Sequence, residues 1–208
     1  MRVHAFVAAA VLAAAGCGSN DEKSFGKVFG QDFTPVEVAF IGPADASCAF
    51  PTVPPTPYSL SAILVGFSST PGICALATDP CVGRKSFTFV GGTVAHADLD
   101  GPPPGLQTGT YTVYANPGAA VPDANLELRA ALVAPVRTDA ACAETSGAPG
   151  SGTIRLDEIG ATQVRGTVDV TFPDGGWLKG SFVATRCDTT FDVCDGAPHS
   201  CGGTQTCP

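Results

Sequence analysis

The stretch that decides the fold is VRGTVDVTFPDGGWLKGSFVATR, residues 164–186. In its first half, Val, Gly and Phe alternate with Arg, Thr and Asp. In its second half, Leu178, Gly180, Phe182 and Ala184 alternate with Lys, Ser, Val and Thr. Strict alternation gives a β-strand one apolar face. The stretch therefore predicts a β-hairpin whose two strands turn their apolar faces to the same side.

The loop length fixes the expected register of this hairpin. We interpret residues 173–177 as a five-residue loop between the two strands. The pairs then predicted to lie opposite each other are Phe172 with Leu178, Val170 with Gly180 and Val168 with Phe182.

Short runs of the same kind recur along the chain between clusters of Gly, Pro and Asp. With 25 Gly, 18 Pro and only 14% charged residues, the chain lacks the composition of a helical protein, and 44% hydrophobic residues exclude general disorder. We expect an all-β fold, an antiparallel sandwich or barrel-like domain of about nine strands stapled by disulfides. The predicted strands are residues 36–41, 60–67, 87–90, 92–97, 110–115, 126–134, 153–159, 164–172 and 178–186. Residues 72–78, flanked by prolines, predict a short helix.

The chain divides into four expected parts. Residues 1–16 are an export signal, 17–35 a modified cysteine with a tether, 36–186 one β domain and 187–208 a cysteine-rich tail. Residues 145–152 have a linker composition, but the three strands that follow are too few for a core of their own. In the tether, Phe25, Phe29 and Phe33 leave open a short docked helix, which Gly26 and Gly30 disfavour. We expect a loose tether with a docked end.

The amino terminus carries the clearest signal for location. Residues 5–16 are an apolar run of 12 residues, shorter than the roughly 20 that a membrane-spanning helix needs. The run ends in Ala14-Ala15-Gly16-Cys17, which resembles the lipobox of bacterial lipoproteins. The resemblance implies cleavage before Cys17 and a lipid on Cys17 that makes the membrane a partner. Gly18, rather than Asp, implies the outer membrane of a two-membrane bacterium. Ala14 stands where the family usually has Leu, and an ordinary signal peptide with Cys17 in a disulfide is the alternative.

The cysteine count agrees with this interpretation. Nine cysteines are an odd number for an exported chain, and setting Cys17 aside leaves eight. Eight thiols in an oxidising compartment predict four disulfides, whose connectivity has 105 possibilities. The disulfide candidates are Cys48, Cys74, Cys81, Cys142, Cys187, Cys194, Cys201 and Cys207.

The tail has no predicted strand to hold it. We therefore expect Cys187, Cys194, Cys201 and Cys207 to pair at least partly among themselves. Zinc held by tail cysteines and His199 is the alternative, and export disfavours it.

A second resemblance covers about a fifth of the chain. Residues 152–154, 164–172, 174–175 and 178–182, with Ala184 and Cys187, look like the carboxy-terminal hairpin of cysteine-containing lipoproteins abundant in myxobacteria. The resemblance implies a β fold and a surface location, and it transfers no catalytic residue.

Charge and motifs exclude several functions. Eleven Lys and Arg against 19 Asp and Glu give a net charge of −8, which argues against a nucleic-acid partner. Beyond the signal only His96 and His199 remain, and no nucleophile elbow, zinc-protease helix or phosphate loop occurs. We predict no catalytic residue, no metal and no cofactor. His96, Asp98 and Asp100 offer too few ligands for a calcium loop.

The sequence predicts a non-catalytic surface scaffold or binding module. Trp177 is the candidate binding residue for a glycan or protein ligand, and Tyr111 with Tyr114 is a further candidate for stacking on sugars. The alternative is a hydrolase of extracellular glycans, which needs two converging carboxylates. The carboxylates considered are Glu37, Glu127, Asp157, Glu158, Asp169 and Asp174.

Overall fold

The structure is a computed structural model that describes residues 25–50, 56–78, 83–98, 101–116 and 127–191, with Cys194 and Cys207. Its helix is α1 (Ile73–Thr78). Its strands are β1 (Phe25–Val28), β2 (Gln31–Phe33), β3 (Glu37–Phe50), β4 (Thr56–Ser68), β5 (Thr88–Asp98), β6 (Gly109–Val113), β7 (Glu127–Thr138), β8 (Glu144–Ser146), β9 (Ser151–Ile159), β10 (Gln163–Thr171) and β11 (Trp177–Arg186).

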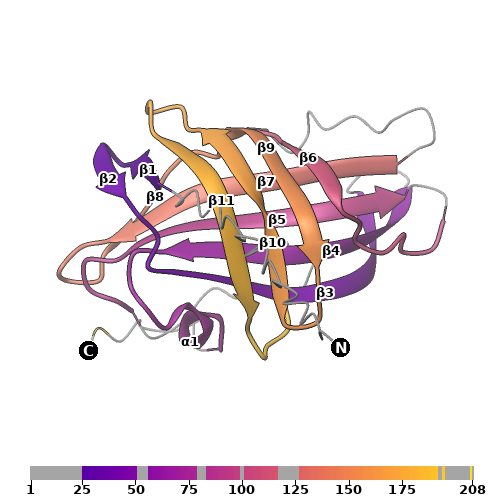
Figure 1. Ribbon diagram of the computed structural model, residues 1–208, viewed down its shortest axis with the longest axis horizontal. Coiled ribbons are helices and arrows are strands. Elements are labelled where there is room, and N and C mark those ends of the chain that lie inside the picture. The colour runs from indigo at the N-terminus through magenta and orange to yellow at the C-terminus, as the bar shows by residue number, and fades with distance from the viewer. Residues whose placement is uncertain are drawn as a thin grey trace, which may run out of the picture.

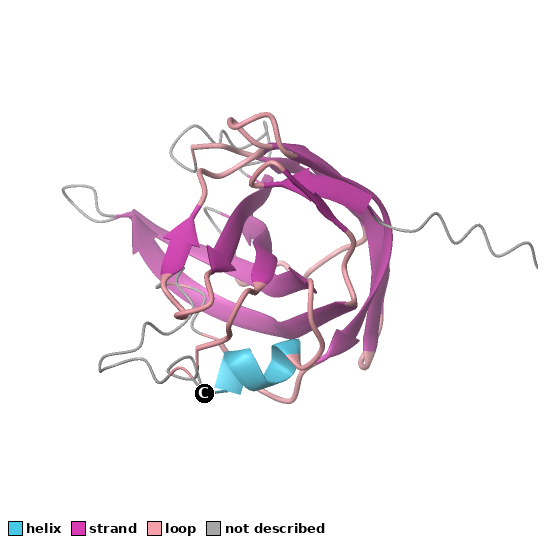
Figure 2. Ribbon diagram, turned by 90° about the vertical axis from the view of Figure 1, so that its left-hand side faces the viewer, coloured by secondary structure: helices cyan, strands magenta, loops and turns pink. Residues whose placement is uncertain are grey.

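Eight of these strands close into a barrel. They pair in the order β10-β9-β6-β7-β5-β4-β3-β11, and the pairing of β10 with β11 completes the ring (Figure 2). In Figure 1, β10 and β11 cross in front of β3, β4 and β5 at a steep angle. The expected all-β, barrel-like fold is confirmed, although two neighbouring pairs, β6–β7 and β3–β11, are parallel.

Apolar side chains fill the inside of the barrel, because alternate residues of each strand point inward. On β10 the buried residues are Val164, Gly166, Val168 and Val170, and the residues between them are exposed. Phe67 of β4 meets Phe182 of β11 edge to face, with ring centroids 5.4 Å apart. The core cluster consists of Val28, Phe33, Phe40, Ile63, Val65, Phe67, Val90, Val94, Tyr111, Val113, Ala131, Val133, Ile154, Leu156, Val164, Val168, Val170, Phe172, Leu178, Phe182 and Ala184.

The predicted hairpin register is wrong by two residues. Val170 lies opposite Leu178, Val168 opposite Gly180 and Gly166 opposite Phe182. The turn is tighter than expected, because the N–H of Gly175 donates to the carbonyl of Phe172 and the N–H of Phe172 donates to that of Gly176. A shift of two residues keeps the side-chain parity, so the apolar faces still coincide as predicted.

Nine predicted strands correspond to eight observed ones, because residues 87–90 and 92–97 both fall on the continuous strand β5 or beside it. The sequence interpretation missed β8, which pairs with β7, and the hairpin of β1 and β2, which pairs with β11. Residues 25–33 thus belong to the sheet. The end of the expected tether that docks on the body is the β1–β2 hairpin, and not a short helix.

The turn of this amino-terminal hairpin explains the departure. Phe29 and Gly30 form a two-residue loop with positive φ angles of 51° and 75°, the geometry of a type I′ turn. The ring of Phe29 stacks under Arg137, 4.8 Å from ring centroid to guanidinium carbon. Val28 and Phe33 join the core cluster, so the hairpin packs against the barrel interior.

Helix α1 matches the prediction for residues 72–78 and lies outside the ring (Figure 2). It packs with Ala39, Ile41 and Cys187 in a small apolar cluster on the outer surface. Within the part of the chain that the structure describes, no helix is long and apolar enough to cross a membrane.

Candidate functional site

The apolar lining of the barrel turns polar at one end. Ser61, His96 and Arg129 are neighbours across β4, β5 and β7. Each has the strand parity of a core residue two positions away, namely Ile63, Val94 and Ala131. Ser61 and His96 are fully buried. These positions interrupt an apolar alternation that the sequence shows, but only the register brings the three residues together.

The segment between β5 and β6 covers this polar end. We name residues 101–108 the capping segment. Ser61 Oγ accepts the N–H of Gly105 at 3.0 Å, and His96 Nδ1 lies 3.0 Å from the carbonyl oxygen of Gly105. Both backbone groups of one residue are therefore held from inside the barrel. Gly105 has a φ of 71°, which favours glycine, and Leu106 packs on the core cluster.

Tyr111 and Arg129 hold the other half of the capping segment. The Tyr111 hydroxyl donates to the carbonyl of Gln107 at 2.5 Å and accepts the N–H of Gln107 at 3.3 Å. Arg129 donates to Gln107 Oε1 at 2.6 Å. Burial raises the pKa of Tyr111, against the lowering effects of the Gln107 hydrogen bond and the Arg129 charge.

A serine beside a histidine raises the question of nucleophilic catalysis. Ser61 Oγ donates to Asp45 Oδ1 at 2.5 Å, so its proton points at a carboxylate and not at the imidazole. His96 Nε2 lies 3.3 Å from Glu127 Oε2. A nucleophile needs its base within hydrogen-bond reach. Here the Ser61 hydroxyl donates to Asp45, and the His96 ring contacts Gly105 and Glu127. The polar cluster fastens the capping segment.

His96 and Asp98, which were considered as cation ligands and set aside, have different surroundings in the structure. His96 is engaged with Gly105 and Glu127, Asp98 ends β5, and Asp100 lies outside the described residues. Among the residues described, no group of three or more His, Cys, Asp or Glu is arranged to hold a metal ion.

Trp177, the candidate binding residue, is the first residue of β11 and not part of a loop. It pairs with Thr171 of β10 on one side and Lys27 of β1 on the other, and it is partly buried. Tyr111 is fully buried in the core cluster and held by Gln107. The sugar-stacking role considered for Tyr111 with Tyr114 is therefore wrong, because a buried ring offers no surface to a ligand.

Each carboxylate considered for glycan hydrolysis has its own ion-pair or hydrogen-bond partner. Asp157 pairs with Arg155, Glu158 with Arg165 and Asp169 with Lys179 on the outer faces of β9, β10 and β11. Asp174 Oδ1 accepts the N–H of Gly176 within the hairpin turn, and Glu127 contacts His96. Glu37 accepts backbone N–H groups at the start of α1. Each of these six carboxylates makes its own local contact.

Three disulfides join described cysteines, and all three connect the tail region to the body. They are Cys48–Cys194, Cys74–Cys187 and Cys142–Cys207. The expected pairing of tail cysteines among themselves is wrong, because three of the four tail cysteines have partners in the body. Zinc bound by Cys194 and Cys207 is excluded for the same reason. Cys17, Cys81 and Cys201 lie outside the described residues.

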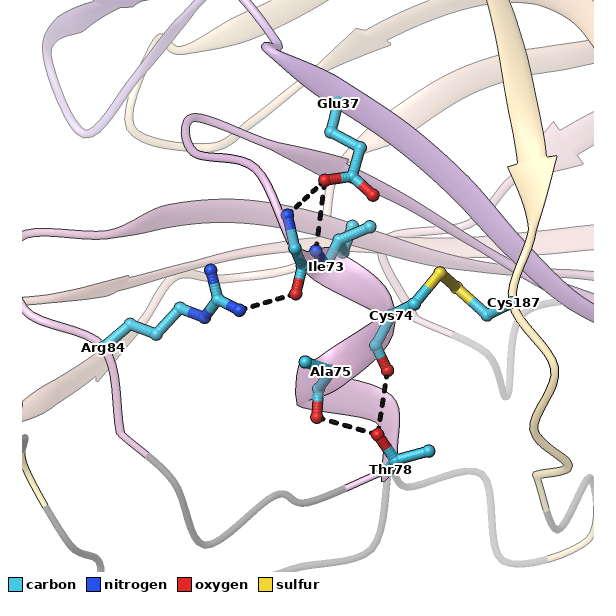
Figure 3. The surroundings of a disulfide bond; sticks show 8 residues. Glu37, Ile73, Cys74, Ala75, Thr78, Arg84 and Cys187 are labelled. Atoms are coloured by element: carbon cyan, nitrogen blue, oxygen red, sulfur yellow. Dashed lines mark hydrogen bonds between the residues drawn. A yellow bond between two sulfur atoms is a disulfide. The ribbon is translucent and has the colours of Figure 1, made fainter.

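Figure 3 shows how one disulfide fixes α1. Cys74 on α1 is bonded to Cys187, which directly follows β11. Glu37 Oε2 accepts the N–H groups of Gly72 and Ile73 at the helix start, and Arg84 donates to the carbonyl of Gly72 at 2.6 Å. A helix of six residues is too short to persist alone, so these contacts hold it on the barrel.

Comparisons with protein-family models, with curated protein sequences and with solved structures find no match to this chain.

Proposed function

We propose that the chain is a lipid-anchored protein of the cell envelope, attached through Cys17 to the outer membrane. Its barrel serves there as a non-catalytic scaffold or binding module, with Trp177 as the candidate contact for a glycan or protein ligand. The proposal includes neither a nucleic-acid partner nor a cofactor.

The disulfide framework is the observation that carries this proposal. Three bridges tie the residues after β11 to β3, to α1 and to the loop between β7 and β8, with sequence separations of 146, 113 and 65. Such covalent bracing persists in oxidising compartments outside the cytoplasm. The apolar filling of the barrel supports a structural role, and the separately engaged carboxylates give the hydrolase alternative no support.

Lipid attachment is tested in a two-membrane bacterium. The unmodified chain is expected to incorporate labelled fatty acid and to sediment with the outer membrane, because the acyl chains bury many CH₂ groups at about 0.8 kcal/mol each. Cys17→Ser should appear in the soluble envelope fraction without label, whereas Ser19→Ala should behave as the unmodified chain. A Cys17→Ser protein that stays on the membrane would refute the attachment site. Protease treatment of whole cells distinguishes the outer surface from the inner leaflet.

Ligand binding is tested on a glycan array and by pull-down of envelope proteins. Binding that Trp177→Ala abolishes and Trp177→Phe retains is expected if the indole stacks on a ligand. Because Trp177 is partly buried between β10 and β1, circular dichroism of both variants must show the native spectrum. Binding that survives Trp177→Ala removes this residue from the proposal.

A further inference from the structure

Trp177, the only tryptophan of the chain, lies among polar residues on the outer face of the sheet. Its neighbour Leu178 is fully buried inside the barrel, so the alternation along β11 turns Trp177 to the outside. Thr171 lies opposite Trp177 on β10, and Lys27 lies opposite it on β1. Thr171 and Lys27 are both exposed.

The same ladder continues on both sides of these residues. Thr171 lies opposite Ser151 of β9, and Lys27 lies opposite Asp32 of β2. Ser151 and Asp32 are exposed as well. Because neighbouring strands lie about 4.8 Å apart, the row that crosses these five strands is about 19 Å long. We name this outward row the Trp177 row; it consists of Ser151, Thr171, Trp177, Lys27 and Asp32.

We propose that the Trp177 row is the binding site for a neutral, linear glycan, with the indole ring against the apolar face of one sugar. The site rests on the proposed function, which makes Trp177 a ligand contact, and it adds the ligand class and the four residues beside the indole.

The chemical groups of the row suit the hydroxyl groups of a sugar. Sugar hydroxyls donate and accept hydrogen bonds, as the hydroxyls of Ser151 and Thr171 do. Lys27 adds a donor and Asp32 an acceptor. The indole ring is carried by a strand that is paired on both sides, by β10 and by β1, so binding orders little of the protein.

The charges around the row favour a neutral glycan over an acidic one. Within the row, the positive charge of Lys27 is opposed by the negative charge of Asp32. Two residues along β10 and β11, Asp169 and Lys179 pair with each other at 2.6 Å. The whole chain carries a net charge of −8. A polyanion would therefore find no surplus of positive charge at this site.

The row is a poor centre for an interface with a second protein. A stable protein interface covers about 800 Å² on each partner and has an apolar centre. Among the residues that the structure describes, the exposed large hydrophobic side chains are Val36 and Val183, and neither belongs to the row. Val183 lies six residues along β11 from Trp177, about 20 Å away at 3.3 Å per residue. The indole is thus the one large apolar group of the row.

Affinity electrophoresis of the detergent-solubilised full chain tests the ligand class. Each native gel contains one soluble polysaccharide. Hydroxyethylcellulose, glucomannan and dextran are the neutral polymers, and alginate and polygalacturonate are the acidic ones. At least one neutral polymer is expected to retard the chain, and neither acidic polymer is. Retardation by an acidic polymer, or by none of the five, would overturn the proposal.

Variants beside the indole test the row itself. Thr171→Val removes one hydroxyl and should weaken binding about twofold to tenfold, the effect of one neutral hydrogen bond. Lys27→Ala should weaken binding about tenfold to a hundredfold, because it removes a charged donor. Thr185→Val is the matched control, since Thr185 is also exposed on β11 but lies eight residues from Trp177, and its affinity should equal that of the unmodified chain. If Thr171→Val and Lys27→Ala bind normally while Trp177→Ala does not, the proposed contact at Trp177 stands and the row is refuted.

The single tryptophan provides a test that needs no variant. All tryptophan fluorescence of the chain comes from Trp177. An oligosaccharide of the polymer that binds best should change this emission saturably, with the same midpoint as the binding measured by calorimetry. Binding that leaves the emission unchanged would place the glycan elsewhere and refute the site.

Discussion

The ring of Phe89 covers two glycines on the outer surface of the barrel. Gly66 of β4 and Gly91 of β5 lie opposite each other, and a Cβ on either would come within 2.5 Å of a Phe89 ring carbon. An aromatic ring that lies over strand glycines supplies the packing that the glycines lack. Gly91 therefore belongs to a continuous strand, although its sequence suggests a break.

Gly91→Ala tests this arrangement. The three heavy atoms nearest to the added methyl group all belong to Phe89, and overpacking of this kind is expected to cost about 1–3 kcal/mol. Urea unfolding gives the free energy of unfolding of Gly91→Ala, Phe89→Ala and the double variant. The cost of Gly91→Ala should largely disappear in the Phe89→Ala background, and strictly additive costs would show that the ring is not the obstacle.

The burial of Tyr111 predicts that the fold loses stability at alkaline pH. Its pKa is raised by burial above the value of 10.0 that it has in the unfolded chain. Its contribution to stability is thus fully present below pH 10 and is lost as pH rises through the folded pKa, because the unfolded chain releases the proton first. Tyr111→Phe should cost about 0.5–1.5 kcal/mol at pH 7 through the lost Gln107 bonds and should weaken the decline above pH 10. Urea titrations across this range, with Tyr114→Phe as control, decide the point; an identical alkaline decline in Tyr111→Phe contradicts it.

At the level of the element, the β10–β11 turn shows what alternation predicts and what it leaves open. The alternating pattern identifies both strands and their buried faces, since these depend on each strand alone. The register depends on the turn, where Pro173, Asp174 and Gly175 follow Phe172. The Pro-Asp-Gly sequence is a turn signal, and a tight turn with glycine at positive φ moves the register by two residues.

Gly175→Ala measures the requirement of this turn. Gly175 has a φ of 81° and no atom within 4 Å of an added Cβ, so the cost is backbone strain alone, about 1–2 kcal/mol. Gly175→Asn should cost less, because Asn tolerates this conformation. Thermal unfolding of the two variants tests the order. Equal costs would mean that the turn relaxes to another geometry.

Residues that no local pattern connects account for the remaining differences between sequence and structure. His96 attracts attention as a metal candidate, but its partners Gly105 and Glu127 are 9 and 31 residues away. The contacts of Ser61 and Arg129 follow from the strand register and from the barrel closure, which are global properties. The hairpin of β1 and β2 was missed because a Phe-Gly loop is not a usual type I′ sequence.

For the whole molecule, the position of β1 limits the distance from a lipid anchor. Residues 18–24 separate Cys17 from Phe25, which pairs with Lys179 of β11. Eight Cα steps span at most about 28 Å. If Cys17 carries lipid, the barrel stays closer to the membrane than the longer expected tether would allow, and the hairpin transmits any pull directly to β11.

The disulfides are predicted to contribute similar amounts of stability despite their different loops. The free energy of loop closure changes by only about 0.6 kcal/mol for each doubling of loop length, so separations of 146, 113 and 65 residues differ little. Replacing both cysteines of a bridge by Ala should lower the free energy of unfolding by about 2–4 kcal/mol in each case. Urea unfolding of the three double variants tests this, and a bridge whose removal costs nothing would contradict it.

The oxidation state of the remaining cysteines is the last prediction. Six of the nine cysteines are in the described bridges, so if Cys17 carries lipid, Cys81 and Cys201 are the two left. In the proposed oxidising compartment, this even remainder predicts that they pair. The Cys17→Ser chain, unfolded without reductant and treated with iodoacetamide, should take up no label, and after reduction it should take up eight. Peptide mapping should then yield a peptide that joins Cys81 to Cys201. Label on Cys81 and Cys201 without reductant would mean that these two thiols are free. The eight cysteines would then form only the three described bridges and not four disulfides.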